Sequence, residues 1–501
     1  MMLRRTIIII LMSSLFAGVA SAQQEVRFEP DTVSVYRNPL TGWVMYLGRS
    51  WDDDFWTKQN YDAMPTSEGT TVRVSDYAGT AYIRTSWSSF EPEEGKYLWR
   101  DPSSRIYRLL KTVTDRGMRL AFRIVVDGRD QGQNTPLYVI DAGAEYFTSE
   151  NGRHKTPFSD DPVFQAKYTK FLEALAEDFN DPDRVEFIDA FGLGKWGESH
   201  ATAYRDPANK VKVFDWITAL YSRTFSRVPL FIHYHRQVGD PNKTSWGEVA
   251  PETEMMLDLA IARGYSLRHD AFGMSGYYTE WETAYAGRWR YKLPIIMEGG
   301  WITAAHHRYW NDPSGRYREG HSEDVRRGEF DHARETHVNM MDLRINDEVR
   351  SWFGTSFDLV KRFVAEGGYR LYPDLVSAPV KARRGESVVV RSRWNNIGWG
   401  YCPTNIPQWN QKYKVAVSLL DEAGIPVRTV VDTHSDLSKW IKGTPDICLT
   451  EVPLEGLKPG KYTWALGLVD TAKGNVPGLE IAVAASHKAG GWLKVNVISI
   501  K

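Results

Sequence analysis

The chain of 501 residues is too long for one average domain, and it suits a barrel of about 250 residues or more followed by a second module. Its 62 basic and 63 acidic residues balance, so the charge indicates neither a nucleic acid nor an anionic membrane surface as a partner. The 19 Trp and 25 Tyr residues are typical of a large aromatic core, and also of surfaces that bind the apolar faces of sugar rings.

The first 22 residues have the pattern of a signal peptide. Arg4 and Arg5 form a basic region, residues 7–16 are mostly apolar, and 20–22 read Ala-Ser-Ala, a small-residue cleavage site. The apolar run is short for a membrane anchor, which is the alternative, and no cysteine follows it that could carry a lipid. We expect a periplasmic or secreted protein with no membrane insertion after the signal is removed.

Short apolar strand patterns alternate with longer helical patterns from about residue 40 to 370. Residues 118–126 are near-continuously apolar, as in a strand buried on both faces, whereas 164–179 repeat apolar side chains at helical spacing. The other strands are expected at 81–84, 185–191, 230–233, 267–272 and 293–297, and the other helices at 106–113, 211–225 and 255–262. This alternation predicts an α/β fold, a (β/α)₈ TIM barrel, over residues 23–375. An open doubly wound sheet is the alternative, but no Gly-x-Gly-x-x-Gly turn follows an early strand.

The last part of the chain, residues 376–501, has the two-residue period of β-strands. Strands are expected at 387–393, 413–420, 462–469 and 492–500, separated by turns such as Lys458-Pro459-Gly460. This predicts a C-terminal all-β immunoglobulin-like sandwich, which either packs on the barrel or binds sugars. Cys402 and Cys448 both lie in it, as a disulfide or as two buried thiols.

Two glutamates stand where barrel strands end. Glu198 closes the stretch 191–198 after the fourth expected strand, and Glu298 ends an apolar strand and is followed by two glycines. Functional groups of such barrels lie at the carboxyl ends of the strands, and cleavage of a glycosidic bond needs a pair of carboxyl groups. Glu198 and Glu298 are therefore the predicted catalytic pair, although each alone could simply pair with an arginine.

The segment 82–87, Tyr-Ile-Arg-Thr-Ser-Trp, followed at 90–99 by Phe-Glu-Pro-Glu-Glu-Gly-Lys-Tyr-Leu-Trp, resembles the second-strand region of clan-A retaining glycosidases. The likeness, which covers roughly residues 38–360, is to β-galactosidase-like barrels and to exported glycosidase-like domains of unknown function. It implies an acid/base at Glu198 after strand four and a nucleophile at Glu298 ending strand seven.

The same resemblance implies the residues around the substrate. Arg84 would lie near the nucleophile and keep it ionised, Tyr277 or Tyr278 would hydrogen-bond it, and Trp352 would floor the sugar subsite. Trp87 and Trp301 are further candidates for sugar contacts. The sequence departs from the clan pattern at Gly197, which follows Trp196. At the position of Gly197, many clan members carry an asparagine that binds the sugar 2-hydroxyl.

These residues together predict an exported glycoside hydrolase that cleaves β-glycosidic bonds of an oligo- or polysaccharide by retention, without a cofactor. The carboxyl groups of a retaining pair lie roughly 5–5.5 Å apart, and we expect a raised pKa for Glu198, the proton donor. Replacement of Glu298 is expected to leave folding intact. The sequence indicates no oligomeric state.

Two other functions compete with this one. His233, His235 and Asp270 could hold a metal ion for hydrolysis, although metal-dependent barrels usually place their His-x-His on the first strand. Histidines that donate to sugar hydroxyls explain the same residues as substrate-binding groups. The third function is a carbohydrate-binding barrel without catalysis, which both glutamates argue against.

Overall fold

The computed structural model describes residues 22–47, 54–129, 131–241, 247–272, 277–300, 318 and 321–501. The predicted signal peptide lies outside these residues, apart from its last residue. Within the described ranges, no helix combines the length and apolar character that a bilayer span requires.

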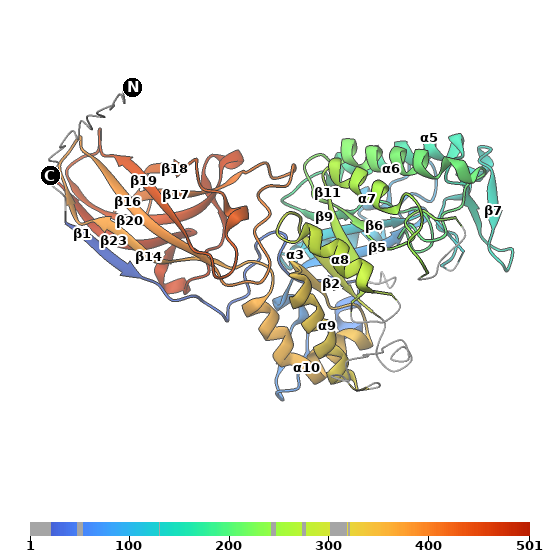
Figure 1. The fold of residues 1–501 in the computed structure, drawn as a ribbon, viewed down its shortest axis with the longest axis horizontal. Coiled ribbons are helices and arrows are strands. Elements are labelled where there is room, and N and C mark those ends of the chain that lie inside the picture. The colour runs from blue at the N-terminus through green and yellow to red at the C-terminus, as the bar shows by residue number, and fades with distance from the viewer. Residues whose placement is uncertain are drawn as a thin grey trace, which may run out of the picture.

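A closed barrel of eight parallel strands forms the first part of the molecule, as predicted (Figure 1). Its strands, in order around the barrel, are β2 (Gly42–Tyr46), β5 (Ala78–Ser86), β6 (Arg119–Val125), β9 (Val185–Asp189), β10 (Leu230–His233), β11 (Tyr265–Phe272), β12 (Ile295–Gly299) and β13 (Met340–Asp342). All eight neighbouring pairs are parallel.

Helices follow the strands and cover the outside of the barrel. The long ones are α3 (Arg105–Asp115), α5 (Pro162–Phe179), α6 (Lys210–Thr224), α7 (Thr253–Ala262), α8 (Glu280–Trp289), α9 (Ser322–Thr336) and α10 (Asp347–Glu366). The short helices are α1 (Phe55–Lys58), α2 (Trp87–Phe90) and α4 (Leu137–Asp141), and two small hairpins join β3 (Met64–Pro65) to β4 (Thr71–Val72) and β7 (Tyr146–Thr148) to β8 (Lys155–Pro157). Local sequence fixes where helices begin: Asp161 accepts from the Phe164 amide with Pro162 in the first turn, and Thr279 with Glu282 forms a capping box.

The two-residue period of the strands builds two layers inside the barrel. The lower layer is almost entirely apolar and consists of Val44, Tyr82, Ala121, Phe187, Phe231, Ser266, Ile296 and Met340. Two residues further along each strand, the upper layer is polar and consists of Tyr46, Arg84, Arg123, Asp189, His233, Arg268, Glu298 and Asp342. Because side chains alternate across a strand, every strand thus delivers a polar side chain to the carboxyl end of the barrel.

Two sheets form the C-terminal unit and share one apolar core. One sheet contains β1 (Gln23–Arg27), β14 (Leu371–Pro379), β16 (Ser387–Asn396) and β19 (Asp446–Pro453). The other contains β15 (Lys381–Ala382), β23 (Trp492–Ile500), β20 (Gly460–Asp470), β17 (Tyr413–Leu420) and β18 (Pro426–Asp432), with β21 (Val476–Leu479) and β22 (Lys488–Ala489) at its margins. The immunoglobulin-like arrangement stays a prediction.

The predicted boundaries of this unit differ from the structure in two respects, the first of which is that β14 begins at Leu371, inside the segment assigned to the barrel. Residues 23–27, assigned by sequence to the barrel segment, form β1 and pair antiparallel with β14 of the C-terminal unit. Four of their five side chains are exposed, so these residues lack the alternation of apolar and polar side chains that marks a half-buried strand. Their pairing partner is also distant in the sequence. Cys402 and Cys448 are buried free thiols.

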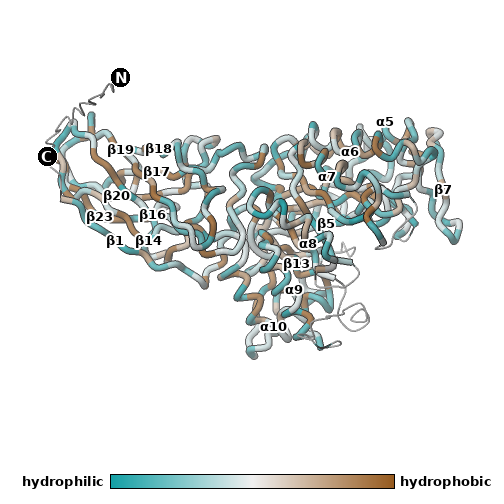
Figure 2. The backbone as a smooth tube through the Cα atoms, in the orientation of Figure 1, coloured by the Kyte–Doolittle hydropathy of each residue, from teal (hydrophilic) through white to brown (hydrophobic). Residues whose placement is uncertain are grey.

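The C-terminal unit packs on the end of the barrel where the strands begin (Figure 1). Three side-chain contacts place it there: Gln408 donates to the Gly264 carbonyl just before β11, Asn405 to the Lys292 carbonyl before β12, and Trp399 to the Val338 carbonyl before β13. Figure 2 shows apolar stretches along the strands of both parts. The carboxyl ends of the barrel strands therefore face away from the C-terminal unit.

Candidate active site

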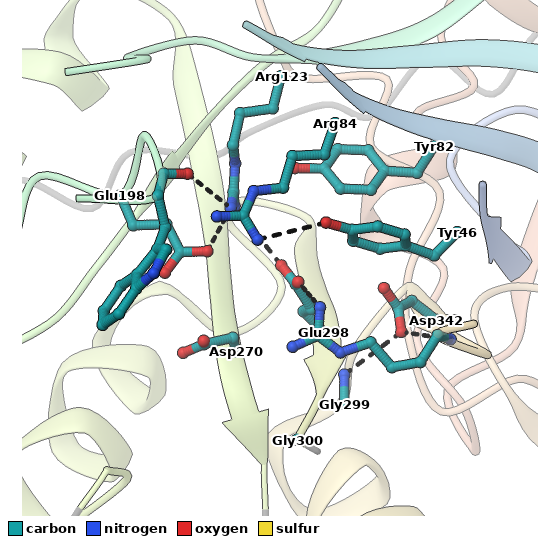
Figure 3. Close-up of polar contacts among 12 residues, drawn as sticks. Tyr46, Tyr82, Arg84, Arg123, Glu198, Asp270, Glu298, Gly299, Gly300 and Asp342 are labelled. Atoms are coloured by element: carbon teal, nitrogen blue, oxygen red, sulfur yellow. Dashed lines mark hydrogen bonds and ion pairs between the residues drawn. The ribbon is translucent and has the colours of Figure 1, made fainter. Parts of the chain in front are cut away.

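The two predicted catalytic glutamates lie at the carboxyl ends of barrel strands four and seven. Glu298 is the penultimate residue of β12 and is fully buried, and Glu198 follows β9 in a loop and is 3% exposed. Figure 3 shows both side chains directed into the same space inside the barrel. The structure therefore brings together the pair that the sequence indicated.

Arg123 connects the two glutamates. Its Nη1 donates to Glu198, and its Nη2 lies 3.5 Å from Oε2 of Glu298 (Figure 3). The guanidinium is also held by Asp189, to which Nε donates at 2.6 Å. Arg123 is completely buried, so three carboxylates surround one cation without intervening bulk water. One rigid fork thus fixes the spacing of the pair.

Glu298 is bound by three arginines. Arg268 from β11 and Arg344 from the loop after β13 both donate to its carboxylate, and Arg123 lies on the third side. Burial of a carboxylate disfavours its charged form, but three cations at contact distance favour that form strongly. This arrangement gives a fully buried carboxylate three cationic partners.

Arg84 was predicted to lie beside the nucleophile, but its observed hydrogen-bond partner is a different residue. Arg84 points into the barrel and lies next to Arg123 in the β5–β6 register, but its Nη1 donates to the Tyr46 hydroxyl at 3.4 Å (Figure 3). The arginines that contact Glu298 come from other strands. Sequence could not distinguish them, because several strands deliver an arginine to the same layer.

The pKa of Glu198 is lowered, whereas the sequence analysis predicted a raised value. Burial acts to raise this pKa, but the charges of Arg123, His233 and Arg84 together lower it to about 2. The expected repulsion between two carboxylates is thus reversed by the cation between them. In this state of the protein Glu198 is ionised.

Four histidines gather beside Glu198. His233 lies between two carboxylates, with Nδ1 3.8 Å from Glu198 Oε2 and Nε2 3.2 Å from Asp270 Oδ1. His200 lies 4.0 Å from Glu198, and its ring stacks on that of His235 with centroids 4.0 Å apart. Burial, and then neighbouring imidazoles, lower the pKa of His200 to about 3, that of His269 to about 4 and that of His235 well below its usual value. These three rings are therefore neutral.

The imidazoles of His200, His233 and His235 form one of two candidate sets for a metal ion among the described residues, and the other consists of His233, His269 and Asp270. Each imidazole of the first set offers a nitrogen, and these nitrogens lie within 4.8 Å of one another, a limit wider than the roughly 3.4 Å between tetrahedral zinc ligands. Both nitrogens of His235 bind backbone, because Nδ1 accepts from the Gln237 amide at 3.2 Å and Nε2 lies 2.9 Å from the Glu198 carbonyl. His235 is thus oriented to support the Glu198 loop.

A second group of carboxyls supports the end of β12. Asp342 accepts from the amides of Gly299 at 3.4 Å and Arg344 at 2.9 Å, and Glu329 accepts from the Gly300 amide at 3.2 Å (Figure 3). Burial raises the pKa of both carboxyls to about 7. These bonds fix the backbone immediately after Glu298.

Two predicted sugar-binding tryptophans belong to the core. Trp352 is fully buried in α10 against Trp43, and Trp87 is fully buried in α2 among Tyr138, Tyr168 and Phe171. Neither has an exposed ring face, so both predictions are wrong. A tryptophan that follows a strand has the same sequence pattern whether it turns to the barrel mouth or to a covering helix.

Of the two tyrosines predicted after strand six, Tyr278 makes its contacts with side chains other than Glu298. Tyr278 bonds the hydroxyl of Tyr234 at 2.9 Å and packs on Phe272 and His332, and Tyr277 is half-buried. The tyrosines beside Arg84 and Arg123 are Tyr46 of the polar layer and Tyr82 of the layer below it (Figure 3). Trp301 lies outside the described residues.

The loop before Glu198 explains the missing asparagine. Gly197 has φ +75°, and a Cβ there would meet Arg123 Cδ at 3.2 Å and Gly192 Cα at 3.3 Å. An asparagine at this position would require the arginine that joins the glutamates, or the backbone at Gly192, to shift by a few tenths of an ångström. Trp196, with φ +60°, is held in the left-handed region and remains half-exposed beside His200.

The described polar contacts include functional candidates that sequence reasoning missed: Tyr46, Arg123, Asp189, Trp196, His200, Arg268, Glu329, Asp342 and Arg344. One sequence signal could have identified the missed residues that lie on strands. It is a polar residue two positions after the last apolar residue that faces into the barrel.

Comparison with known proteins assigns the chain to no family. No protein-family model matches the chain, and no curated protein is similar to it in sequence. Similar solved structures include the catalytic domain of a β-amylase from Paenibacillus polymyxa, with 10% identity over 66% of this chain and 98% of that one and a TM-score of 0.37. Xylanase 10B from Thermotoga maritima has 11% identity over 63% and 84%, with a TM-score of 0.36, and a β-glucosidase from Exiguobacterium marinum has 11% over 61% and 89%, with a TM-score of 0.34.

Proposed function

We propose that the protein is an exported glycoside hydrolase that cleaves β-glycosidic bonds with retention. The observation that supports this most is one buried guanidinium, Arg123, which holds two carboxylates at the ends of strands four and seven. Hydrolysis of a glycosidic bond needs two carboxyl groups on opposite sides of the reacting carbon. The substrate class is an oligo- or polysaccharide.

Glu298 is the proposed nucleophile, because three arginines keep it charged and its backbone is fixed by Asp342 and Glu329. Its carboxylate forms a bond to the anomeric carbon while the bond to the leaving oxygen breaks. Glu198 gives its proton to that oxygen. Water then attacks the glycosyl-enzyme, Glu198 accepts the proton of the water, and Glu298 leaves.

Glu198 must gain a proton before the first step, although it is ionised beside Arg123. We infer that the leaving-group oxygen enters between Glu198 and Arg123. This separation weakens the effect of Arg123, the charge that lowers the pKa of Glu198 most. Burial, which raises that pKa, then dominates. Arg123 stays bound to Asp189, so the site retains its shape.

The C-terminal unit is proposed to act as an immunoglobulin-like support for the barrel. Its contacts are with the ends where strands begin, remote from the glutamates. Export is proposed from the first 22 residues, and it is tested by sequencing the N-terminus of protein recovered outside the cytoplasm.

The test of catalysis is a screen of 4-nitrophenyl β-glycosides with purified protein, before and after dialysis against a chelator. Hydrolysis that survives the chelator and is lost in Glu298→Gln supports the glycosidase. Loss with the chelator would favour the metal-dependent hydrolase built on His233, His235 and Asp270, and binding without turnover would favour a carbohydrate-binding barrel. NMR of the first-formed sugar decides retention, since the initial product must keep the β configuration.

A further inference from the structure

Among the residues that the structure describes, Arg84 is the arginine of the polar layer that has no carboxylate partner. Arg123, its neighbour in the β5–β6 register, contacts three carboxylates, and Arg268 and Arg344 both bind Glu298. Within the ranges that the structure describes, Arg84 has one hydrogen bond, to the neutral hydroxyl of Tyr46 at 3.4 Å. The positive charge of Arg84 therefore has no carboxylate partner there, whereas the charges of Arg123, Arg268 and Arg344 do.

The remaining donors of Arg84 are unsatisfied. Its Nε and Nη2 are shielded from water and have no hydrogen-bond partner, and the neighbouring Thr85 hydroxyl is in the same condition. A buried donor without a partner is costly, and most costly when it carries charge. An acceptor from outside the chain would offset that cost, and an anion would do so best.

A pocket lies beside Arg84. It has a volume of about 190 Å³ and is lined by Arg84, Thr85, Ser86, Ser89, Gln131 and Asn134, with Val125 as its apolar member. The lining combines one cation with hydroxyl and amide groups and contains no carboxylate. Its volume suits a substituent or a single small unit of a ligand rather than a long chain.

The pocket is electrostatically connected to the catalytic pair. Arg84 is close enough to Glu198 to contribute to lowering its pKa, and its register partner Arg123 binds Glu198 directly. A sugar whose reacting carbon lies between Glu198 and Glu298 would therefore have part of its ring or a neighbouring unit near Arg84 (Figure 3).

We propose that Arg84 and this pocket bind the anionic group of a charged sugar, the carboxylate of a uronic acid or a sulfate ester. This assignment of substrate class rests on the proposed glycosidase function. A guanidinium donates two parallel N–H groups to such anions, which Nε and Nη2 of Arg84 have available. Serine hydroxyls and amides beside it suit the hydroxyl groups that surround the charge on a sugar.

The experiment compares sugars that differ only at carbon six. Binding of D-glucuronate, D-galacturonate and glucose 6-sulfate to the full chain is measured by calorimetry against glucose and galactose. The corresponding 4-nitrophenyl β-glycosides are compared by kcat/KM. We expect at least one charged member to be preferred roughly 10- to 100-fold, the range of a charge-assisted hydrogen bond. The preferred member distinguishes carboxylate from sulfate.

Variants assign the preference to Arg84. Arg84→Gln is expected to abolish it, and Arg84→Lys to keep part of it, because the charge remains and the fork is lost. Arg73→Gln, which removes an exposed arginine paired with Asp76, is the matched control and should keep the full preference. Circular dichroism and Tm establish that each variant is folded. If Arg84→Gln does not fold, the partial loss of preference in Arg84→Lys tests the assignment instead.

The outcomes separate this inference from the proposed function. Equal affinity for charged and neutral sugars overturns the inference, even if neutral glycosides are hydrolysed, and so does a preference that survives in Arg84→Gln. Preferential binding of a charged sugar that depends on Arg84, together with no hydrolysis of any glycoside, supports the anion site and contradicts the glycosidase.

Discussion

Arg268 binds the carboxylate of Glu298 from the adjacent strand, and neither side chain is open to solvent. In the parallel β11–β12 register, Arg268 is opposite Ile296, two residues before Glu298. The ion pair thus crosses between two strands inside the polar layer. A carboxylate held in this way belongs to the internal structure of the barrel as well as to its chemistry.

Replacement of Glu298 should therefore affect both activity and stability. Glu298→Ala is expected to abolish turnover and to lower the free energy of unfolding by about 3–5 kcal/mol, because buried arginines lose their counterion. The sequence analysis expected no loss of stability. Urea denaturation measures the change, with Glu68→Ala, an exposed pair with Lys361, as a control that should lose less than about 1 kcal/mol. Equal stability of Glu298→Ala and the wild type would contradict the structure.

Glu198→Ala should act selectively on substrates that need acid assistance. Glycosides with poor leaving groups are expected to lose about 10²–10⁴-fold in kcat/KM, the usual contribution of a general acid, whereas 2,4-dinitrophenyl glycosides should lose much less in the first step. A plot of rate against leaving-group pKa measures this. If the loss is the same for all leaving groups, Glu198 is not the acid.

The ionised state of Glu198 should appear in the pH dependence of stability. Its folded pKa of about 2 lies below the ordinary value of about 4.3, so its stabilising contribution is complete above pH 4.3 and declines as the pH falls towards 2. The difference in the free energy of unfolding between wild type and Glu198→Gln should shrink over this range, by roughly 3 kcal/mol at most. In Arg123→Gln, the pKa of Glu198 should rise above its usual value, which ¹³C NMR of the labelled carboxyl would detect.

Glu329 should give the opposite pH dependence. Burial raises its folded pKa to about 7, so the protonated form is favoured by folding. Its contribution is complete below about pH 4.3 and is lost as the pH rises to 7. Denaturation at a series of pH values should show the stability of the wild type falling relative to that of Glu329→Gln over this window. Asp342 should contribute in the same direction in both proteins, and identical slopes in the two proteins would refute the role of Glu329.

Trp196 should take the sugar-binding role that the sequence analysis gave to Trp352. Trp196→Ala removes a half-exposed ring beside His200, and we expect KM to rise about 2- to 10-fold with little change in Tm. Trp352→Ala removes a fully buried ring and should cost about 3–5 kcal/mol without a specific effect on KM. Measurements of KM and of the free energy of unfolding for both variants test these two expectations.

The barrel was predictable because its signal is spread over many elements. Residues 164–179 repeat apolar side chains at helical spacing, and the observed α5 spans Pro162–Phe179. Likewise 230–233 is the observed β10. Glu298 was found because an apolar strand that runs into a carboxylate is unusual and chemically costly unless it serves a site.

The environment of the glutamates was not predictable in the same way. Arg123 interrupts an otherwise apolar strand, and sequence does not reveal which face of a strand is inward until the register of all eight is known. The pKa of Glu198 followed from that arginine and could not be inferred from two carboxylates alone. The prediction for Trp352 failed because this residue lies on α10 and packs against Trp43, a contact that the sequence does not reveal.

The pairing of β1 with β14 has a consequence for how the protein folds. Gln23 and Ser377, in contact across these strands, are 354 residues apart, so this edge of the sheet cannot close until nearly three quarters of the chain has followed its beginning. Contacts of such long sequence separation form slowly, because the loop between them must be ordered or closed first. During refolding, we expect the first strand to stay unpaired until β14 has formed. A chain shortened after residue 370 would leave that strand exposed, with an open β edge available to other chains.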